Sequence, residues 1–125
     1  MAKKRILLID DEEDVCYLTK LNLESTGRYE VDTARNGEEG LAKALTTTYD
    51  LIITDYKMPG VDGKEVLKTL KQHARIPVVL FSIYYDDPLF RNDDVLKSAD
   101  GVISKPISKD DLITIIERTL AKGTQ

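Results

Sequence analysis

Five short apolar runs, separated by longer segments with helical spacing, constrain the fold of this 125-residue chain more than any other feature. Runs of four to eight apolar residues bounded by turn residues are typical of buried strands. These runs lie at residues 5–9, 29–34, 51–54, 77–81 and 101–104. The first, third and fourth are apolar throughout, which favours central strands covered on both faces. The second alternates with polar residues, which favours a place near an edge.

The first two intervening segments are predicted helices. Residues 15–25 have helical spacing, and Thr26-Gly27 is a stop signal. Their apolar positions are Val15, Leu18 and Leu21. In the second segment, Asn36 is the predicted cap, and Glu39 is placed to complete a capping box. A modest apolar face follows at Gly40, Leu41, Ala44 and Leu45.

Three further helices are expected towards the C-terminus. One runs from residue 62 or 63 to 71 and should bury an apolar face. That face comprises Val66, Leu67 and Leu70. Within residues 83–99, Asp87-Pro88 is a candidate cap and first helical position, leading to Val95, Leu96 and Ala99. Ser108 should cap the last helix, with Asp111 three residues on. Its apolar face comprises Leu112, Ile113, Ile115, Ile116 and Leu120.

Alternating strands and helices with short connections predict an α/β fold with helices on both faces of a parallel sheet. Right-handed crossovers leave few topologies for five strands. The doubly wound, flavodoxin-like order 2-1-3-4-5 is the natural one. A length of 125 residues suits one domain with a core at about residues 5–120, and no output domain is expected within it.

Composition narrows the classes of function. Eighteen basic and 22 acidic residues give a net charge of −4, and no basic stripe indicates direct nucleic-acid binding. Cys16 is the only cysteine, so an internal disulfide is excluded and a reducing compartment is favoured. No segment is long and apolar enough to span a bilayer. We therefore expect a soluble cytoplasmic protein that does not contact membranes.

Acidic, hydroxyl and amine side chains that could bind a ligand directly follow four of the apolar runs. In the predicted strand order, the carboxyl ends of strands 1, 3, 4 and 5 are neighbours, and ligands of open α/β sheets bind beyond those ends. The residues there are Asp10, Asp11, Asp55, Ser82 and Lys105. A structural alternative exists for each acid, because Asp55 is suited to capping a turn and Asp10 or Asp11 to capping the next helix.

Carboxylates gathered in one crevice repel one another by about 1 kcal/mol per pair at 4 Å even in water. A cation relieves that repulsion, and oxygen ligands on an open surface suit Mg²⁺, with Mn²⁺ as the alternative ion. A carboxylate is also an established nucleophile towards phosphoryl groups. Asp55, on the middle strand, is the best nucleophile candidate, with Lys105 and Ser82 placed to contact the phosphoryl oxygens.

The ordered set of motifs resembles the receiver domain of two-component response regulators over nearly the whole chain. The matching residues are 8–12, 53–63, Ser82 and Ser104-Lys105-Pro106. The resemblance implies that Asp55 accepts a phosphoryl group from a histidine kinase or phosphotransfer protein. It also implies a downstream effector protein, and a monomer or a weak, phosphorylation-dependent dimer. Such a domain is a phosphoacceptor with slow autodephosphorylation, not a turnover enzyme.

The resemblance also assigns the remaining roles. Asp11 and Asp55 would ligate Mg²⁺ directly, Asp10 through a water molecule, and Lys57 through its backbone carbonyl. Ser82 would be the switch hydroxyl, and Lys105 the phosphate-binding lysine. The Lys105-Pro106 peptide bond is expected to be cis.

Three features depart from the family pattern. Ile83 stands where a small residue usually follows the switch hydroxyl, and Val102 stands where an aromatic ring is usual. Tyr84 or Tyr85 is a candidate substitute for that ring. Lys57 and Tyr84 occupy positions that tune dephosphorylation, and their bulk predicts slow loss of phosphate. A phosphoryl half-life of seconds or less would contradict that expectation.

Competing functions differ in visible features. A haloacid dehalogenase-type hydrolase needs a second Asp where this chain has Lys57. A flavodoxin-like nucleotide binder needs a neutral or glycine-rich phosphate loop, whereas Asp10-Asp11 would repel the anion. The remaining alternative is a receiver-like interaction module that does not switch by phosphorylation.

Overall fold

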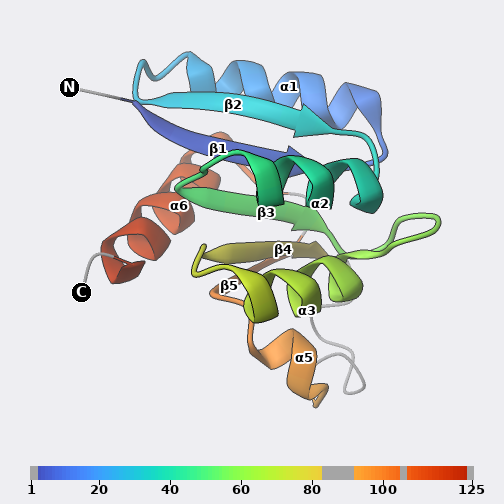
Figure 1. Ribbon diagram of the computed structural model, residues 1–125. Coiled ribbons are helices and arrows are strands. Elements are labelled where there is room, and N and C mark those ends of the chain that lie inside the picture. The colour runs from blue at the N-terminus through green and yellow to red at the C-terminus, as the bar shows by residue number, and fades with distance from the viewer. Residues whose placement is uncertain (1–2, 83–91, 105–106, 124–125) are drawn as a thin grey trace.

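The computed structural model describes residues 3–82, 92–104 and 107–123. Five parallel strands form one sheet in the order β2-β1-β3-β4-β5, as predicted (Figure 1). The strands are β1 (Lys4–Ile9), β2 (Tyr29–Ala34), β3 (Leu51–Asp55), β4 (Val78–Ser82) and β5 (Gly101–Ser104). The described helices are α1 (Glu13–Glu24), α2 (Gly37–Thr46), α3 (Gly63–His73), α5 (Asp94–Lys97) and α6 (Lys109–Gly123).

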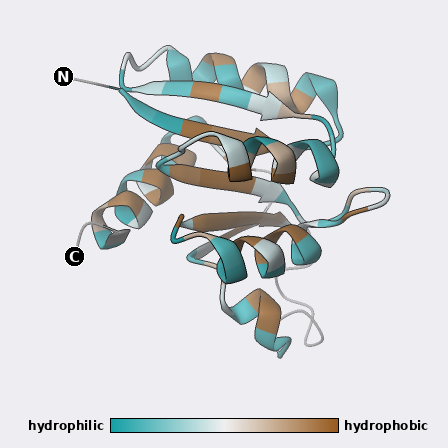
Figure 2. Ribbon diagram, in the orientation of Figure 1, coloured by the Kyte–Doolittle hydropathy of each residue, from teal (hydrophilic) through white to brown (hydrophobic). Residues whose placement is uncertain are grey.

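Both faces of the sheet are buried, which explains why the central strands are apolar throughout. Leu7 and Ile9 of β1 pack in a cluster with residues of α2, α3 and α5. Ile6 and Leu8, which point to the other face, pack with residues of α1 and α6. Figure 2 shows the hydrophobic residues concentrated on these central strands. Both faces of the sheet are therefore covered, and the buried carboxylates Asp10 and Asp55 lie at the ends of β1 and β3.

Local capping signals fixed several helix starts as predicted. The Asn36 side chain accepts a hydrogen bond from Glu39 N at 2.8 Å, and the Ser108 hydroxyl accepts one from Asp111 N at 3.1 Å. Asp62 caps α3 by accepting from Glu65 N at 3.0 Å. The Glu39 carboxylate lies 3.5 Å from the backbone N of Arg35. The expected return bond to Asn36 is thus displaced by one residue.

The predicted burial of α3 and α6 is confirmed. Val66, Leu67 and Leu70 are buried, and Leu112 and Ile116 of α6 are buried with the other predicted apolar positions packed beside them. Both helices have apolar positions on one stripe only, so the pattern defines a single face.

The predicted faces of α1 and α2 are partly wrong. Leu18 and Leu21 are 59% and 48% exposed, and Leu45 of α2 is 51% exposed. The buried positions of α1 are Cys16 and Leu23. These two residues are seven apart and share one stripe, whereas Leu18 and Leu21 lie on the opposite side of the helix, which has 3.6 residues per turn. The helix docks on the sheet through the stripe that contains Cys16, which the apolar spacing did not predict.

The described helix before β5 starts at a cap of its own. Asp93 is the N-cap of α5 and accepts hydrogen bonds from Val95 N and Leu96 N. Helix α5 begins at Asp94 and ends at Lys97, so the predicted helical position Ala99 lies beyond its end. Asp87-Pro88 lies outside the described residues. Within the described part of the chain, no helix is long and apolar enough to cross a membrane.

Candidate functional site

Asp10 and Asp11 lie in the turn that leaves β1. Asp10 N donates to Ala34 O at 3.1 Å, which extends the sheet by one bond, and the Cys16 thiol lies 3.3 Å from Asp10 O. Asp10 Oδ1 accepts from Glu12 N at 3.0 Å. The N-cap of α1 is Glu12, with no side-chain capping bond. Helix capping therefore does not account for either aspartate.

Asp55 ends β3, the strand between β1 and β4. Its neighbour Tyr56 donates its backbone N–H to Phe81 O at 2.9 Å, so pairing with β4 continues past Asp55. The chain then turns through Gly60, which has a φ of +76°, and returns so that Gly63 N donates to Tyr56 O at 2.9 Å. A Cβ at Gly63 would lie 2.3 Å from Asp55 O. Only glycine permits this close approach of α3 to the strand end.

The three predicted acids do come together. One carboxylate oxygen from each of Asp10, Asp11 and Asp55 lies within 4.8 Å of the other two. Asp10 and Asp55 are buried, whereas Asp11 is exposed. At such separations the mutual repulsion is on the order of 1–4 kcal/mol per pair, depending on the effective dielectric constant. An all-oxygen donor set open to solvent on one side fits Mg²⁺, which keeps several water ligands.

Ser82 lies beside this cluster in the sheet register. Asp55 pairs with Phe81, and Ser82 follows it as the last residue of β4, opposite Ser104 of β5. Its side chain is buried at this strand end. Several predicted features lie outside the described residues. These are Ile83, Tyr84, Tyr85, Lys105 and Pro106, together with the expected cis peptide bond between Lys105 and Pro106.

Val102 and Lys57 were singled out in the sequence, the first for the missing aromatic ring and the second as a metal ligand. Val102, in place of the usual ring, is half-buried on the α3 side of the sheet and pairs with Leu80. The Lys57 side chain is exposed in the loop after β3. The role of the Lys57 carbonyl as a metal ligand stays a prediction.

Sequence reasoning missed two supporting contacts. No part in the site was predicted for Cys16, whose thiol lies 3.3 Å from the Asp10 carbonyl oxygen. Gly63 was expected only as a helix start, but it gives α3 access to the Asp55 backbone. A glycine at the predicted start of α3 carried a signal for the second contact, because glycine is used where one backbone segment approaches another closely. The sequence carried no signal for the first.

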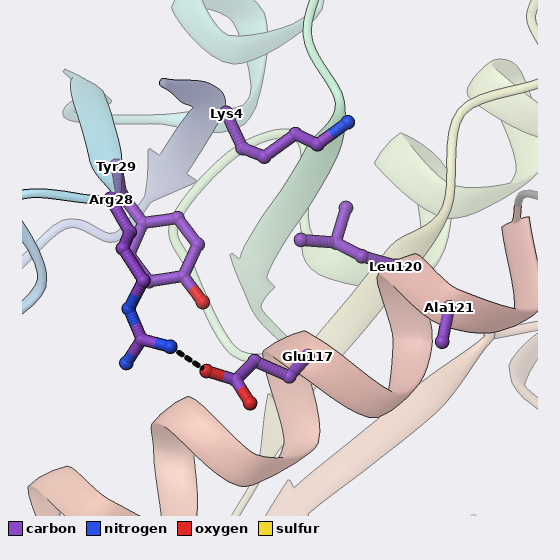
Figure 3. A pocket seen from close by; sticks show the side chains of 6 residues that line it. All are labelled: Lys4, Arg28, Tyr29, Glu117, Leu120 and Ala121. Atoms are coloured by element: carbon purple, nitrogen blue, oxygen red, sulfur yellow. Dashed lines mark hydrogen bonds and ion pairs between the residues drawn. The ribbon is translucent and has the colours of Figure 1, made fainter. Parts of the chain in front are cut away.

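A separate hollow of about 340 Å³ opens at the other end of the sheet (Figure 3). It is lined by Lys4, Arg28, Tyr29, Glu117, Leu120 and Ala121. An ion pair between Arg28 and Glu117 crosses from the start of β2 to α6. Lys4 and Tyr29 begin their strands, so this hollow and the carboxylate cluster occupy opposite ends of the sheet. The residues predicted to bind the metal ion and the phosphoryl group lie at the other end of the sheet, where the strands have their carboxyl ends.

Comparison with known proteins agrees with this geometry. The family model of the response regulator receiver domain matches residues 6–117. The alkaline phosphatase synthesis transcriptional regulatory protein PhoP of Bacillus subtilis is 40% identical over 105 residues, which are 84% of this chain and 43% of PhoP. The Bacillus subtilis transcriptional regulatory protein ResD is 31% identical over 121 residues, 97% of this chain and 50% of ResD. The chain thus spans about half the length of these relatives.

Solved structures give the same result. The response regulator TrrA of Thermotoga maritima, in complex with Mg²⁺-BeF, has a TM-score of 0.83 and 37% identity, covering 93% of this chain and 98% of TrrA. A structure of the histidine kinase ThkA in complex with TrrA also matches, with a TM-score of 0.82 and 36% identity, covering 94% of this chain and 98% of the matched chain. The family-model match and these similarities, together with the observed strand order, show that this chain belongs to the family of response regulator receiver domains.

Proposed function

We propose that this receiver domain accepts a phosphoryl group on Asp55 from the phosphohistidine of a histidine kinase or phosphotransfer protein. The observation that carries the proposal is the cluster of Asp10, Asp11 and Asp55 oxygens within 4.8 Å of one another at the sheet end. Three carboxylates so close together repel one another, and a bound cation removes this unfavourable energy. Phosphotransfer uses both a nucleophilic carboxylate and that cation.

In the proposed step, an Asp55 carboxylate oxygen attacks the phosphorus. The O–P bond forms as the phosphorus–nitrogen bond of phosphohistidine breaks, and the imidazole nitrogen keeps the electron pair. Asp11 and Asp55 would hold Mg²⁺ directly together with the Lys57 carbonyl, and Asp10 would hold it through a water molecule. The bound ion would supply positive charge to the phosphoryl oxygens. Ser82 would donate its hydroxyl to the same group, and Lys105 would pair with it.

Phosphorylation then biases a conformational equilibrium that a partner reads. The phosphoryl group adds charge and acceptor oxygens where β3 and β4 end, and residues drawn to it stabilise the active state. That TrrA was solved both with Mg²⁺-BeF and with a histidine kinase supports this role for the present chain. The alternative is a receiver-like interaction module that does not switch by phosphorylation.

Labelling with acetyl phosphate and Mg²⁺ separates these functions. We expect the intact mass of the wild type to rise by one phosphoryl group, and Asp55→Asn to show no increase because the nucleophilic oxygen is lost. Asp110→Asn is the matched control, since Asp110 is an exposed aspartate of α6 outside the cluster. An unmodified wild type, under conditions that label a control receiver, would favour the non-switching module.

The exposed apolar side chains of α1 predict where the phosphodonor docks. Tyr17, Leu18 and Leu21 are all exposed on α1, which begins two residues after Asp11. Exposed apolar patches of this kind mark interaction sites, and a histidine-bearing domain that reaches Asp55 must contact this neighbourhood. We expect Leu21→Ser to slow transfer from a histidine kinase about tenfold, the cost of about one lost anchor residue.

The control for that experiment is Leu45→Ser. Leu45 is about as exposed as Leu21 but lies on α2, on the other face of the sheet. Transfer from the kinase should be unaffected by this change, and acetyl phosphate should label both variants at the wild-type rate. Equal effects of the two substitutions on kinase transfer would rule out α1 as the docking helix.

A further inference from the structure

The hollow at the amino end of the sheet has the size and the lining of a small-molecule site (Figure 3). Its volume of about 340 Å³ falls within the range of ligand pockets, which begins near about 300 Å³. With about 30 Å³ for each water-sized group, the hollow has room for about eleven such groups. Leu120 and Ala121 of α6 give it an apolar wall, and the Tyr29 ring faces Leu120 across it.

Arg28 joins the two sides of this hollow. Its guanidinium carbon lies 5.8 Å from the centroid of the Tyr29 ring, and the group forms an ion pair with Glu117 of α6. The walls are therefore linked before any ligand arrives, so binding loses little free energy to ordering them. Among the described residues that line the hollow, Glu117 is the one acid, and Arg28 neutralises it.

The Tyr29 hydroxyl is the group that indicates a ligand. Tyr29 is only 3% exposed, and Figure 3 shows its hydroxyl directed into the hollow. Among the residues that the structure describes, none forms a hydrogen bond with this hydroxyl. Tyrosine hydroxyls of buried rings usually have a hydrogen-bond partner. Burial and the nearby Glu117 charge raise the pKa of Tyr29, so the hydroxyl keeps its proton at neutral pH and is available as a donor.

Lys4 adds a positive charge at the rim of the hollow. Its side chain is exposed, and its ammonium forms no ion pair with any residue in the described part of the chain. Because Arg28 and Glu117 neutralise each other, Lys4 leaves the lining with one uncompensated positive charge. The hollow thus offers an ammonium and a hydroxyl donor beside an apolar wall. An apolar molecule that carries an anionic acceptor group complements all three.

We propose that this hollow binds a small organic carboxylate whose apolar body is a ring or a branched chain. The body packs between Tyr29 and Leu120, where it leaves water. The carboxylate pairs with the Lys4 ammonium and accepts a hydrogen bond from the Tyr29 hydroxyl. For a ligand of about ten non-hydrogen atoms we expect a Kd of about 1 mM. The site lies at the end of the sheet away from Asp55, so it does not depend on the proposed function.

A heteronuclear NMR titration with benzoate tests the site, in EDTA so that no metal ion binds the probe. We expect saturable shifts of the amide signals of Tyr29, Leu120 and Ala121, with a Kd of about 1 mM. Benzyl alcohol, which has the ring without the charge, should bind about fivefold more weakly. Acetate, which has the charge without the ring, should cause no saturable shift because it buries too little apolar area.

Two substitutions separate the contributions of the polar groups. Tyr29→Phe should raise the Kd for benzoate about three- to tenfold, because it removes one hydrogen bond to a charged group. Lys4→Gln should raise it about two- to fivefold, the range of an exposed ion pair, and should leave the affinity for benzyl alcohol unchanged. Lys68→Gln is the matched control and should bind benzoate like the wild type. Lys68 is an exposed lysine of α3, which packs on the other face of the sheet from α6.

Four results would overturn the proposed carboxylate site. The first is the absence of saturable shifts at about 20 times the expected Kd. The second is equal affinity for benzoate and benzyl alcohol, since the hollow would then not select an anion. The third is a set of shifts centred on α1 in place of the hollow. The fourth is wild-type affinity for benzoate in both Tyr29→Phe and Lys4→Gln. Urea unfolding of each variant shows whether weaker binding reflects lost structure, and Lys4→Gln alters only an exposed side chain.

Discussion

Replacing Asp11 by asparagine should make the magnesium-free protein more stable and nearly insensitive to Mg²⁺. Asp11 is the exposed member of the three-carboxylate cluster, with an oxygen within 4.8 Å of Asp10 and of Asp55. Removing its charge relieves two repulsive pairs at about 1 kcal/mol each in a largely aqueous setting. Asparagine has the same shape, so no cavity forms. We expect the free energy of unfolding in EDTA to rise by about 1–2 kcal/mol.

In the presence of Mg²⁺, the wild type should become more stable than Asp11→Asn. At 100 times its Kd, the ion stabilises the wild type by about 2.7 kcal/mol, because it binds only the folded state. A hundredfold loss of affinity, a reasonable cost for losing a direct ligand, would leave the variant only about 0.4 kcal/mol. Urea unfolding with EDTA and with Mg²⁺ measures both quantities, with Asp110→Asn as control. A variant that gains as much from Mg²⁺ as the wild type would show that Asp11 is no ligand.

Replacing Gly63 by alanine should destabilise the protein by about 2–3 kcal/mol and slow phosphorylation. The added Cβ would lie 2.3 Å from Asp55 O and 2.7 Å from Tyr56 Cα, both backbone atoms of the central strand end. Alanine gains up to about 1 kcal/mol over glycine in helix propensity, which is too little to offset a clash with atoms that cannot rotate away. Either α3 or the Asp55 carbonyl must move, and both define the site.

Gly101→Ala is the matched control. A Cβ at Gly101 in β5 would have its nearest neighbour, Val79 Cγ2, at 3.5 Å, which is ordinary van der Waals contact. Its effect should stay within about 1 kcal/mol, with a small gain from reduced freedom of the unfolded chain. Urea denaturation gives the stabilities, and acetyl phosphate labelling gives the rates. Equal stabilities of Gly63→Ala and Gly101→Ala would mean that α3 can recede from β3 at little cost.

Much of the architecture was determined by the sequence itself. Apolar runs of strand length, caps such as Asn36 and Ser108, and short connections specify five parallel strands and their order, because these signals are local and right-handed crossovers leave few alternatives. The convergence of Asp10, Asp11 and Asp55 followed from that order, since each aspartate ends or follows a neighbouring strand. The gathering of these three aspartates at one end of the sheet was therefore predictable from the sequence.

Only the tertiary structure decided which stripe of α1 faces the core, which lysine pairs with Asp93, and how α3 meets Asp55. Cys16 and Leu23 are buried in place of Leu18 and Leu21 because docking selects a face by shape, which periodicity does not encode. Asp93 caps α5 while pairing with Lys64, 29 residues away. Contacts between residues distant in sequence form only once the chain has folded, so no local pattern could show them.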